Sequence, residues 1–182
     1  SRDLPETIAG VRATLAELAQ YAGGASVVLR SDLDGFLPAI VDAAEAQQVD
    51  SELAALQHVL CEYPSPVVVA FEGDADGAGW LLGLSADACV HAERARYSTD
   101  ALWRHPSLLR RAAVLFAHRL GANRAKRCLF EPAAVAGAEL ATGAAVVRGD
   151  AADVLAHALA LAGGLSDAFP LRVPALRARR RA

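Results

Sequence analysis

A glycine-rich loop with carboxylates is the segment of this sequence whose residue types point most directly to chemistry. Gly73, Gly77 and Gly79 alternate with Asp74 and Asp76 between two apolar runs. Backbone N–H groups exposed by such a loop, at the start of a helix, can stabilise an oxyanion or bind a phosphate. The pattern alone leaves two interpretations open, a ligand site and a plain tight turn.

The spacing in this loop does not fit the common nucleotide and metal motifs. A Walker sequence needs a lysine that is absent here, and the third glycine of a dinucleotide fingerprint would fall on Leu82. The run from Glu72 resembles the start of a calcium loop, but its twelfth position is Gly83 instead of a bidentate glutamate. The five histidines lack metal-ligand spacing. We therefore predict neither a nucleotide site nor a metal site.

Carboxylates at or near loops are the candidate acid/base groups. Asp74 and Asp76 lie inside the glycine loop, and Asp100 follows a short apolar run. A carboxyl group whose surroundings raise its pKa can act as a general acid or base. The alternative is that all three residues are ordinary solvated loop carboxylates, and the sequence leaves this choice open.

Helical and strand patterns alternate on both sides of the loop. Apolar residues recur at helical spacing over 5–22 and 50–63, and the apolar stretch 80–84 predicts a helix directly after the loop. A last helix is expected over 153–162, ended by two glycines. Short apolar runs predict strands over 26–29, 67–71, 88–92, 95–98 and 145–147. This alternation predicts an α/β fold with a mostly parallel sheet.

Length and composition favour one domain over residues 1–182, because a chain that is 54% hydrophobic can bury its own core. The net charge of −3 argues against a nucleic-acid partner, and neither a leader nor a membrane-spanning run is recognised. Three widely spaced cysteines fit a reducing, cytoplasmic setting. Residues 171–182 are rich in arginine, which favours a solvated basic tail.

Residues 65–87 resemble the core of the crotonase (enoyl-CoA hydratase) superfamily. The family pattern runs proline, apolar strand, glycine, short loop, glycine triplet, helix and aspartate, and it aligns here from Pro66 to Asp87 without a gap. Residues 92–97, 119–130 and 137–146 resemble further stretches of the family. Residues 82–87, 97–100 and 113–121 are most similar to the decarboxylating enoyl-CoA hydratase homologue of bacterial polyketide β-branching cassettes.

The resemblance implies a crotonase-like ββα-spiral that is shortened at its N-terminus, because the family's opening β-hairpin has no counterpart here. It implies an acyl-thioester substrate carried on CoA or on the phosphopantetheine of an acyl carrier protein, with no further cofactor and no metal. It also implies a homo-oligomer, such as a trimer, or a hetero-oligomer with another crotonase-like protein. No membrane and no nucleic acid are expected among the partners.

The resemblance also assigns an oxyanion hole, in which two backbone N–H groups hold the thioester carbonyl while an enolate forms. One donor maps onto Ala78, flanked by Gly77 and Gly79, and substrate contact is also expected near Ser31, after the strand at 26–29. The residues that would assist a proton or a substrate carboxylate are Asp76, Thr99 and Asp100.

The chain departs from the family at its usual acid and base residues. The two hydratase glutamates fall at Leu81 and Ala101, the lysine of the decarboxylase subgroup falls near residues 43–45, and no histidine follows Leu161. Hydration by two glutamates is therefore not predicted. Two functions stay open. The first is a lyase that decarboxylates or dehydrates a glutaconyl-type thioester in polyketide biosynthesis, and the second is a catalytically inactive subunit that binds a partner enzyme or carrier protein.

Overall fold

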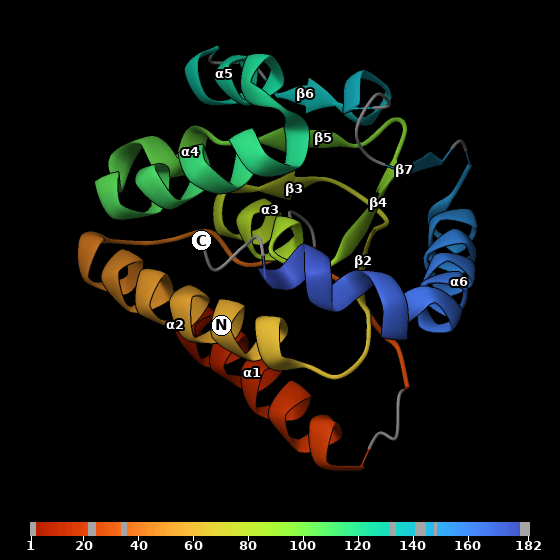
Figure 1. Ribbon diagram of the computed structural model, residues 1–182. Coiled ribbons are helices and arrows are strands. Elements are labelled where there is room, and N and C mark those ends of the chain that lie inside the picture. Colours follow the sequence, from red (N-terminus) through yellow and green to blue (C-terminus); the bar gives the residue numbers. More distant parts are fainter. Residues whose placement is uncertain are drawn as a thin grey trace.

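The computed structural model of this chain describes residues 3–21, 25–33, 36–131, 134–140, 145–147 and 149–178, apart from the side chains of residues 21 and 167–178. Helices and strands alternate along the chain, as the sequence predicts (Figure 1). In chain order the elements are α1 (Leu4–Tyr21), β1 (Val27–Leu29), α2 (Ala43–Glu62), β2 (Val67–Phe71), β3 (Ala75–Asp76), α3 (Gly77–Leu84), β4 (Ala88–Ala92), β5 (Arg96–Ser98), η1 (Asp100–Arg104), α4 (Pro106–Leu120), α5 (Ala122–Phe130), β6 (Val135–Ala136), η2 (Gly137–Leu140), β7 (Ala145–Val147) and α6 (Ala151–Ala178).

A parallel sheet with the strand order β1-β2-β4-β7 forms the centre of the fold. In this sheet β2 lies between β1 and β4, with Val67 opposite Val27 and Val69 opposite Cys89. All residues of β2 are buried, which explains why this strand is apolar throughout instead of alternating. A smaller sheet has the order β3-β5-β6, in which β3 runs parallel to β5 and β6 runs antiparallel to it.

Helices cover these sheets on several sides (Figure 1). Helices α1 and α2 pack against each other, α6 packs on the four strands of the larger sheet, and α4 packs on α5 and η1. Helix α3 is buried along its whole length. A Cβ atom at Gly83 would stand 2.1 Å from the Phe71 ring, so this glycine allows α3 to pack directly on β2.

Helix α2 begins at Ala43, earlier than its apolar pattern predicts. The Asp42 side chain accepts a hydrogen bond from the Glu45 N–H at 2.8 Å, and the Glu45 carboxylate accepts one from the Val41 N–H at 2.6 Å. The prediction of a start near residue 50 is wrong because these capping bonds fix the helix start without any apolar period. The buried face then follows the predicted spacing, through Ala46, Val49, Leu53, Leu56 and Leu60.

Helix α6 continues past its expected end at Gly163 and Gly164 and reaches Ala178. The backbone of residues 171–178 is helical, whereas the predicted solvation of the basic tail over 171–182 falls on side chains outside the described part and stays a prediction. Packing of α6 on the larger sheet outweighs the weak helix propensity of the two glycines. Even with this length α6 is no membrane span, since none of the helices within the described residues is long and apolar enough to cross a bilayer.

Candidate functional site

The glycine loop leads from β3 into α3, whose first turn is buried. Gly77 has a φ of +47°, and a Cβ atom there would lie 3.0 Å from the Cβ of Ala101. A side chain would strain both the backbone and this contact, so the position requires glycine. The Asp76 side chain makes no N-cap bond to α3 and interacts with the backbone of its first residue, Gly77. The N–H of Ala78 therefore lies at the positive end of the helix dipole without an Asp76 cap.

The segment after β1 leaves the sheet beside the glycine loop. Because β1 and β2 run parallel, Arg30 and Glu72 emerge at the same edge. They form a two-point ion pair, with Arg30 Nη2 3.0 Å from Glu72 Oε2 and Arg30 Nε 2.8 Å from Glu72 Oε1. The Ser31 hydroxyl accepts a hydrogen bond from the Leu33 N–H at 3.1 Å. Ser31 thus lies in a turn at the sheet edge expected for the substrate, and its contact with a substrate stays a prediction.

Phe36 anchors the chain that follows this turn. Its ring is buried, with its centroid 4.7 Å from that of Phe71 in β2. The residue has a φ of 70°, which bulky side chains rarely adopt. A strained backbone conformation of this kind persists where packing holds the residue in place. Here the contact with Phe71 holds Phe36 and so fixes the path of the chain between β1 and α2. Residues 34–35, which complete the connection, lie outside the described residues.

The pairing of β3 with β5 brings the candidate carboxylates together. Asp76 lies opposite Ser98 in the parallel ladder, and the Ser98 hydroxyl accepts a hydrogen bond from the Asp100 N–H at 3.1 Å. Both aspartates are exposed, and Ser98 is half-buried between them and the core. The structure therefore places Asp76 and Asp100 at one location, beside the start of α3.

The surroundings of Asp76 favour its protonated form. Partial desolvation raises the pKa of Asp76, and the negative charge of Asp100 raises it further. Hydrogen bonds from the Gly77 backbone, the Ser98 hydroxyl and the Ala101 backbone act in the opposite direction. Because the residue as a whole is exposed, solvent screening limits the size of the shift. A carboxyl group with a raised pKa can donate a proton as a general acid.

Apolar residues occupy the two positions at which the resemblance would place glutamates. Leu81 is fully buried inside α3. Ala101 lies against Gly77, so position 101 is beside the glycine loop as the resemblance implies. Neither position supplies a carboxylate, and Asp76 and Asp100 are acidic residues that lie next to the start of α3 instead.

Thr99 lies apart from this exposed group. Thr99 is only 2% exposed, and its hydroxyl donates a hydrogen bond to the carbonyl of Cys128. That carbonyl is in the last turn of α5, where C=O groups lack a partner within the helix. The placement indicates a structural bond between the end of β5 and α5, and it argues against direct contact of Thr99 with a substrate.

Sequence reasoning missed two polar features of this region, the Ser98 hydroxyl and the Arg30–Glu72 ion pair. The pair left a signal, because an arginine directly follows one apolar strand and a glutamate directly follows the next. Opposite charges that follow adjacent parallel strands meet at one sheet edge. The position of Ser98 left no such signal, since it depends on the pairing of β3 with β5.

His91 belongs to the core and not to this site. It is fully buried in β4, with its ring centroid 5.0 Å from Phe71 and 4.8 Å from Tyr97. Burial lowers the pKa of His91 to about 3, and the positive charge of the nearby Arg119 lowers it further, whereas the Ala145 backbone acts in the opposite direction. The ring is therefore neutral at physiological pH. Elsewhere in the described residues, no cluster of three His, Cys, Asp or Glu side chains could hold a metal ion.

Neither a protein-family model nor a curated protein sequence matches this chain. Solved structures do match it. A dehydratase/decarboxylase enzyme couple involved in polyketide β-branching is 19% identical with a TM-score of 0.73, covering 97% of this chain and 76% of that one. The ECH2 decarboxylase domain of CurF from Lyngbya majuscula is 21% identical with a TM-score of 0.69, covering 93% and 71%. A probable enoyl-CoA hydratase/isomerase from Mycobacterium abscessus is 19% identical with a TM-score of 0.73, covering 97% and 70%.

This chain has the crotonase fold. The α/β class and the crotonase-like architecture expected from residues 65–87 are thereby confirmed. Sequence identities of 19–21% establish a shared fold. They do not transfer the activities of those three proteins to this chain. The crotonase fold accounts for the meeting of the end of β1, the glycine loop and η1, three segments that lie far apart in the sequence.

Proposed function

We propose that this protein binds an acyl thioester and acts on it as a lyase, decarboxylating or dehydrating a glutaconyl-type intermediate of polyketide biosynthesis. One observation carries the proposal. The start of α3 lies beside Asp76 and Asp100, so the proposed oxyanion donor and the proposed proton-transfer groups would act at one location. The thioester would be carried on CoA or on the phosphopantetheine of a carrier protein. Further support comes from the crotonase-fold structures named for decarboxylation and polyketide β-branching.

The decarboxylation would proceed through a thioester dienolate. The bond between the substrate carboxylate and its neighbouring carbon breaks, carbon dioxide leaves, and the electron pair moves into the thioester carbonyl. The N–H of Ala78 would stabilise the resulting oxyanion, together with a donor near Ser31. A proton then passes to the dienolate carbon, and Asp76 in its protonated form is suited to donate it. The balance is one substrate anion and one proton giving carbon dioxide and a shorter enoyl thioester.

Dehydration would use the same groups in other roles. An ionised Asp100 would remove the proton next to the thioester carbonyl, and protonated Asp76 would assist departure of the hydroxyl group as water. The oxyanion donors would stabilise the enolate between these steps. Hydration by two glutamates has no support, because positions 81 and 101 are Leu81 and Ala101.

A catalytically inactive subunit is the second candidate. The apolar residues at positions 81 and 101 favour it, since a crotonase-fold protein without those carboxylates could bind a thioester or a partner without turning it over. In this role the chain would assemble with another crotonase-like enzyme or bind a carrier protein. Homo-oligomers, such as trimers, are part of the first proposal, and hetero-oligomers are part of the second.

Release of labelled carbon dioxide tests the first candidate against the second. The substrate is 3-methylglutaconyl thioester with an isotope-labelled carboxyl group, prepared both on CoA and on a polyketide carrier protein. Release well above the rate without protein supports the lyase. A parallel incubation with the hydroxylated precursor thioester measures loss of water. No release and no water loss from either thioester, with retained binding of the carrier protein, would favour the inactive subunit.

A further inference from the structure

Charge is distributed unevenly along this chain. Residues 101–130 contain seven Lys/Arg and no Asp or Glu, whereas residues 1–100 contain 16 Asp/Glu and five Lys/Arg. The cationic stretch folds into η1, α4 and α5, and α4 packs against both of the others. The net charge of −3 for the whole chain therefore combines a positive region with a strongly negative remainder.

Part of this positive charge is not neutralised within the protein. Arg111 forms an ion pair with Asp50 at 2.6 Å, and Arg127 pairs with two glutamates. Other members of the group are exposed and form no ion pair among the described residues. These are Arg104, Arg110 and Lys126.

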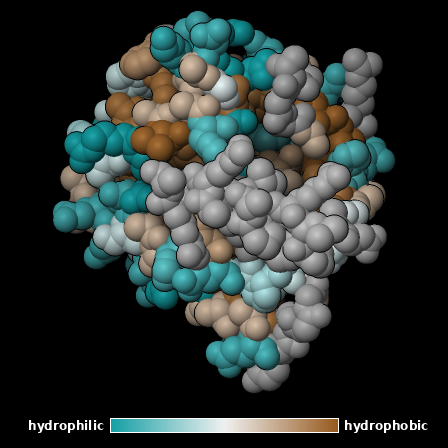
Figure 2. All heavy atoms as spheres, viewed as in Figure 1, coloured by the Kyte–Doolittle hydropathy of each residue, from teal (hydrophilic) through white to brown (hydrophobic). Residues whose placement is uncertain are grey.

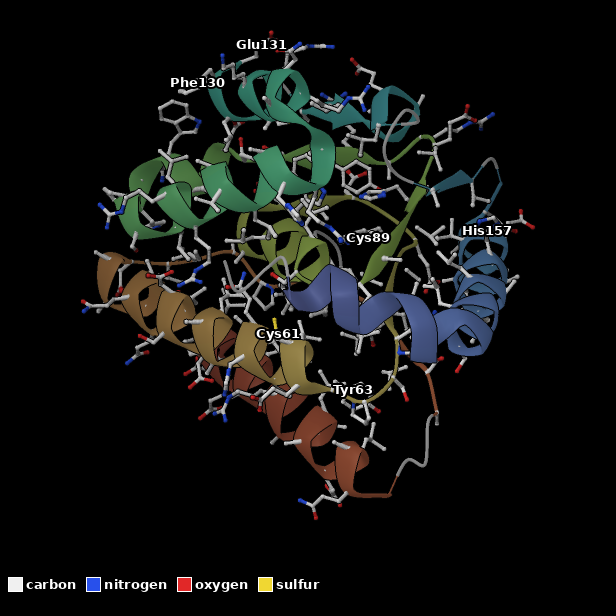
Figure 3. The ribbon with its side chains drawn as sticks, viewed as in Figure 1. Cys61, Tyr63, Cys89, Phe130, Glu131 and His157 are labelled. Atoms are coloured by element: carbon white, nitrogen blue, oxygen red, sulfur yellow. The ribbon has the colours of Figure 1, made fainter. Side chains whose placement is uncertain are left out.

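Two exposed aromatic rings lie next to these cations. Trp103 in η1 is 46% exposed and Phe130 at the end of α5 is 69% exposed, with ring centroids 6.1 Å apart. Phe130 projects outward from α5 (Figure 3), and hydrophobic residues gather on the surface over α4 (Figure 2). Arg104 follows Trp103 in the chain, and Lys126 shares a helix face with Phe130 because Phe130 is four positions further along α5. Exposed aromatic and arginine side chains are typical of the anchors of protein interfaces.

The aromatic and cationic residues lie close to the candidate site. Asp100 is the first residue of η1, and Trp103 and Arg104 are in the same short helix. A 3₁₀-helix of this length rises only about 10 Å from end to end. A protein bound at Trp103 would therefore stand at the entrance to the region around Asp76 and Asp100.

We propose that Trp103, Arg104, Lys126 and Phe130, here called the η1–α5 patch, form the docking surface for an acidic carrier protein that presents the thioester. This inference rests on the proposed function and specifies its substrate as carrier-bound. Charge complementarity selects the partner, since an acidic surface is attracted to the patch and repelled by the acidic remainder of the chain. Two copies joined patch to patch would place like charges together.

The test is calorimetric binding of a pantetheinylated polyketide carrier protein with an acidic surface, carrying no acyl group. We compare the wild type with the double variant Arg104→Glu and Lys126→Glu. The matched control is Arg94→Glu with Arg96→Glu, two exposed arginines outside the patch that give the same change of net charge. We expect the patch variant to bind about tenfold or more weakly at low salt, and the control to stay within about twofold. Trp103→Ala should weaken binding by about tenfold as well.

Several results would overturn the docking surface. Equal weakening by both double variants would indicate unspecific attraction. Self-association that the patch variant abolishes, in a protein that binds no carrier protein, would identify a second copy as the occupant. Tighter binding of a nucleic acid than of the carrier protein would identify a different partner.

The docking surface and the lyase can fail separately. Binding by calorimetry needs no turnover, so a bound carrier protein without any reaction would overturn the lyase and leave the docking surface standing. Conversely, equal turnover of CoA and carrier thioesters, unchanged by the patch variants, would overturn the docking surface and leave the lyase standing. If both proposals hold, the patch variant raises KM for the carrier-bound thioester and leaves kcat/KM for the CoA thioester unchanged.

Discussion

Asp76 and Ser98 lie opposite each other in the parallel ladder of β3 and β5, and the Ser98 hydroxyl is also the acceptor for the Asp100 N–H at 3.1 Å. One serine thus connects the carboxylate of Asp76 with the backbone of Asp100. Hydrogen bonding from Ser98 lowers the pKa of Asp76, whereas the charge of Asp100 raises it. The protonation of Asp76 is therefore coupled to both neighbours.

Two variants should move the pKa of Asp76 in opposite directions. Ser98→Ala removes a hydrogen bond to the ionised carboxylate, so the pKa should rise. Asp100→Asn removes a nearby negative charge, so the pKa should fall. Carboxyl carbon chemical shifts recorded by NMR across an acid titration measure both changes. A shift of the same sign in the two variants would contradict the geometry described for this site.

Gly77→Ala should destabilise the protein and Gly73→Ala should not. A methyl group at Gly77 meets the Cβ of Ala101 at 3.0 Å on a backbone with φ of +47°, which costs about 1–2 kcal/mol for the backbone alone. A methyl group at Gly73 meets nothing within 4 Å. Urea unfolding of the two variants makes the comparison. Equal stability of both would mean that the glycine loop is not held as described.

Thr99→Val separates a structural role of Thr99 from a catalytic one. The variant leaves the buried Cys128 carbonyl without its hydroxyl donor, which should cost about 1–3 kcal/mol of unfolding free energy. Thr7→Val is the control, because the Thr7 hydroxyl also donates to a backbone carbonyl but is exposed. Turnover per folded molecule should change little in either variant. A large fall in kcat for Thr99→Val at full folding would instead support the catalytic role expected from the sequence.

His91 should make the protein less stable as the pH falls below 6.5. Its pKa is about 3 in the folded protein and near 6.5 when unfolded, so between these values the unfolded chain binds the additional proton. Stability should therefore be complete above pH 6.5 and decline toward pH 3, by up to about 1.4 kcal/mol per pH unit from this residue. His91→Phe should flatten this slope.

The exposed His157, which lies on α6 (Figure 3), provides the control for this pH effect. His157→Asn should leave the pH dependence of unfolding as in the wild type, because an exposed side chain is solvated in both states. Denaturant unfolding at a series of pH values gives the slopes. An unchanged slope in His91→Phe would show that another group causes the loss of stability in acid.

Much of this architecture can be predicted from local patterns in the sequence. The apolar runs of β2 and β4, and the glycine loop followed by α3, depend on neighbours in the chain and were predicted correctly. The start of α2 was missed because a polar cap at Asp42 sets it, and the length of α6 because packing on the larger sheet sets it. The approach of Ser98 to Asp76 depends on strand pairing, which no local pattern specifies.

The same distinction holds for the candidate residues. The position of Gly77, Ala78 and Gly79 at the start of a helix could be predicted from the glycine spacing, and their contact with a substrate stays a prediction. The grouping of Asp76 with Asp100 required the structure, as did the buried position of Thr99. A site formed by the backbone of one loop can be predicted from the local sequence. A site formed by side chains on separate elements requires knowledge of how those elements pack.

Decarboxylation by matched aspartate variants tests the central claim most directly. A carrier protein loaded with 3-methylglutaconyl is incubated with the wild type, with Asp76→Asn and with Asp74→Asn, and loss of the mass of carbon dioxide is followed by intact-mass spectrometry. Asp74 is the control, because its carboxylate accepts a hydrogen bond from the Arg96 N–H at 2.8 Å and an amide oxygen can replace it. The account predicts turnover by the wild type and Asp74→Asn, and a rate at least about 100-fold lower for Asp76→Asn, which cannot donate the proton. Equal rates for all three proteins, or no mass loss with any of them, would contradict it.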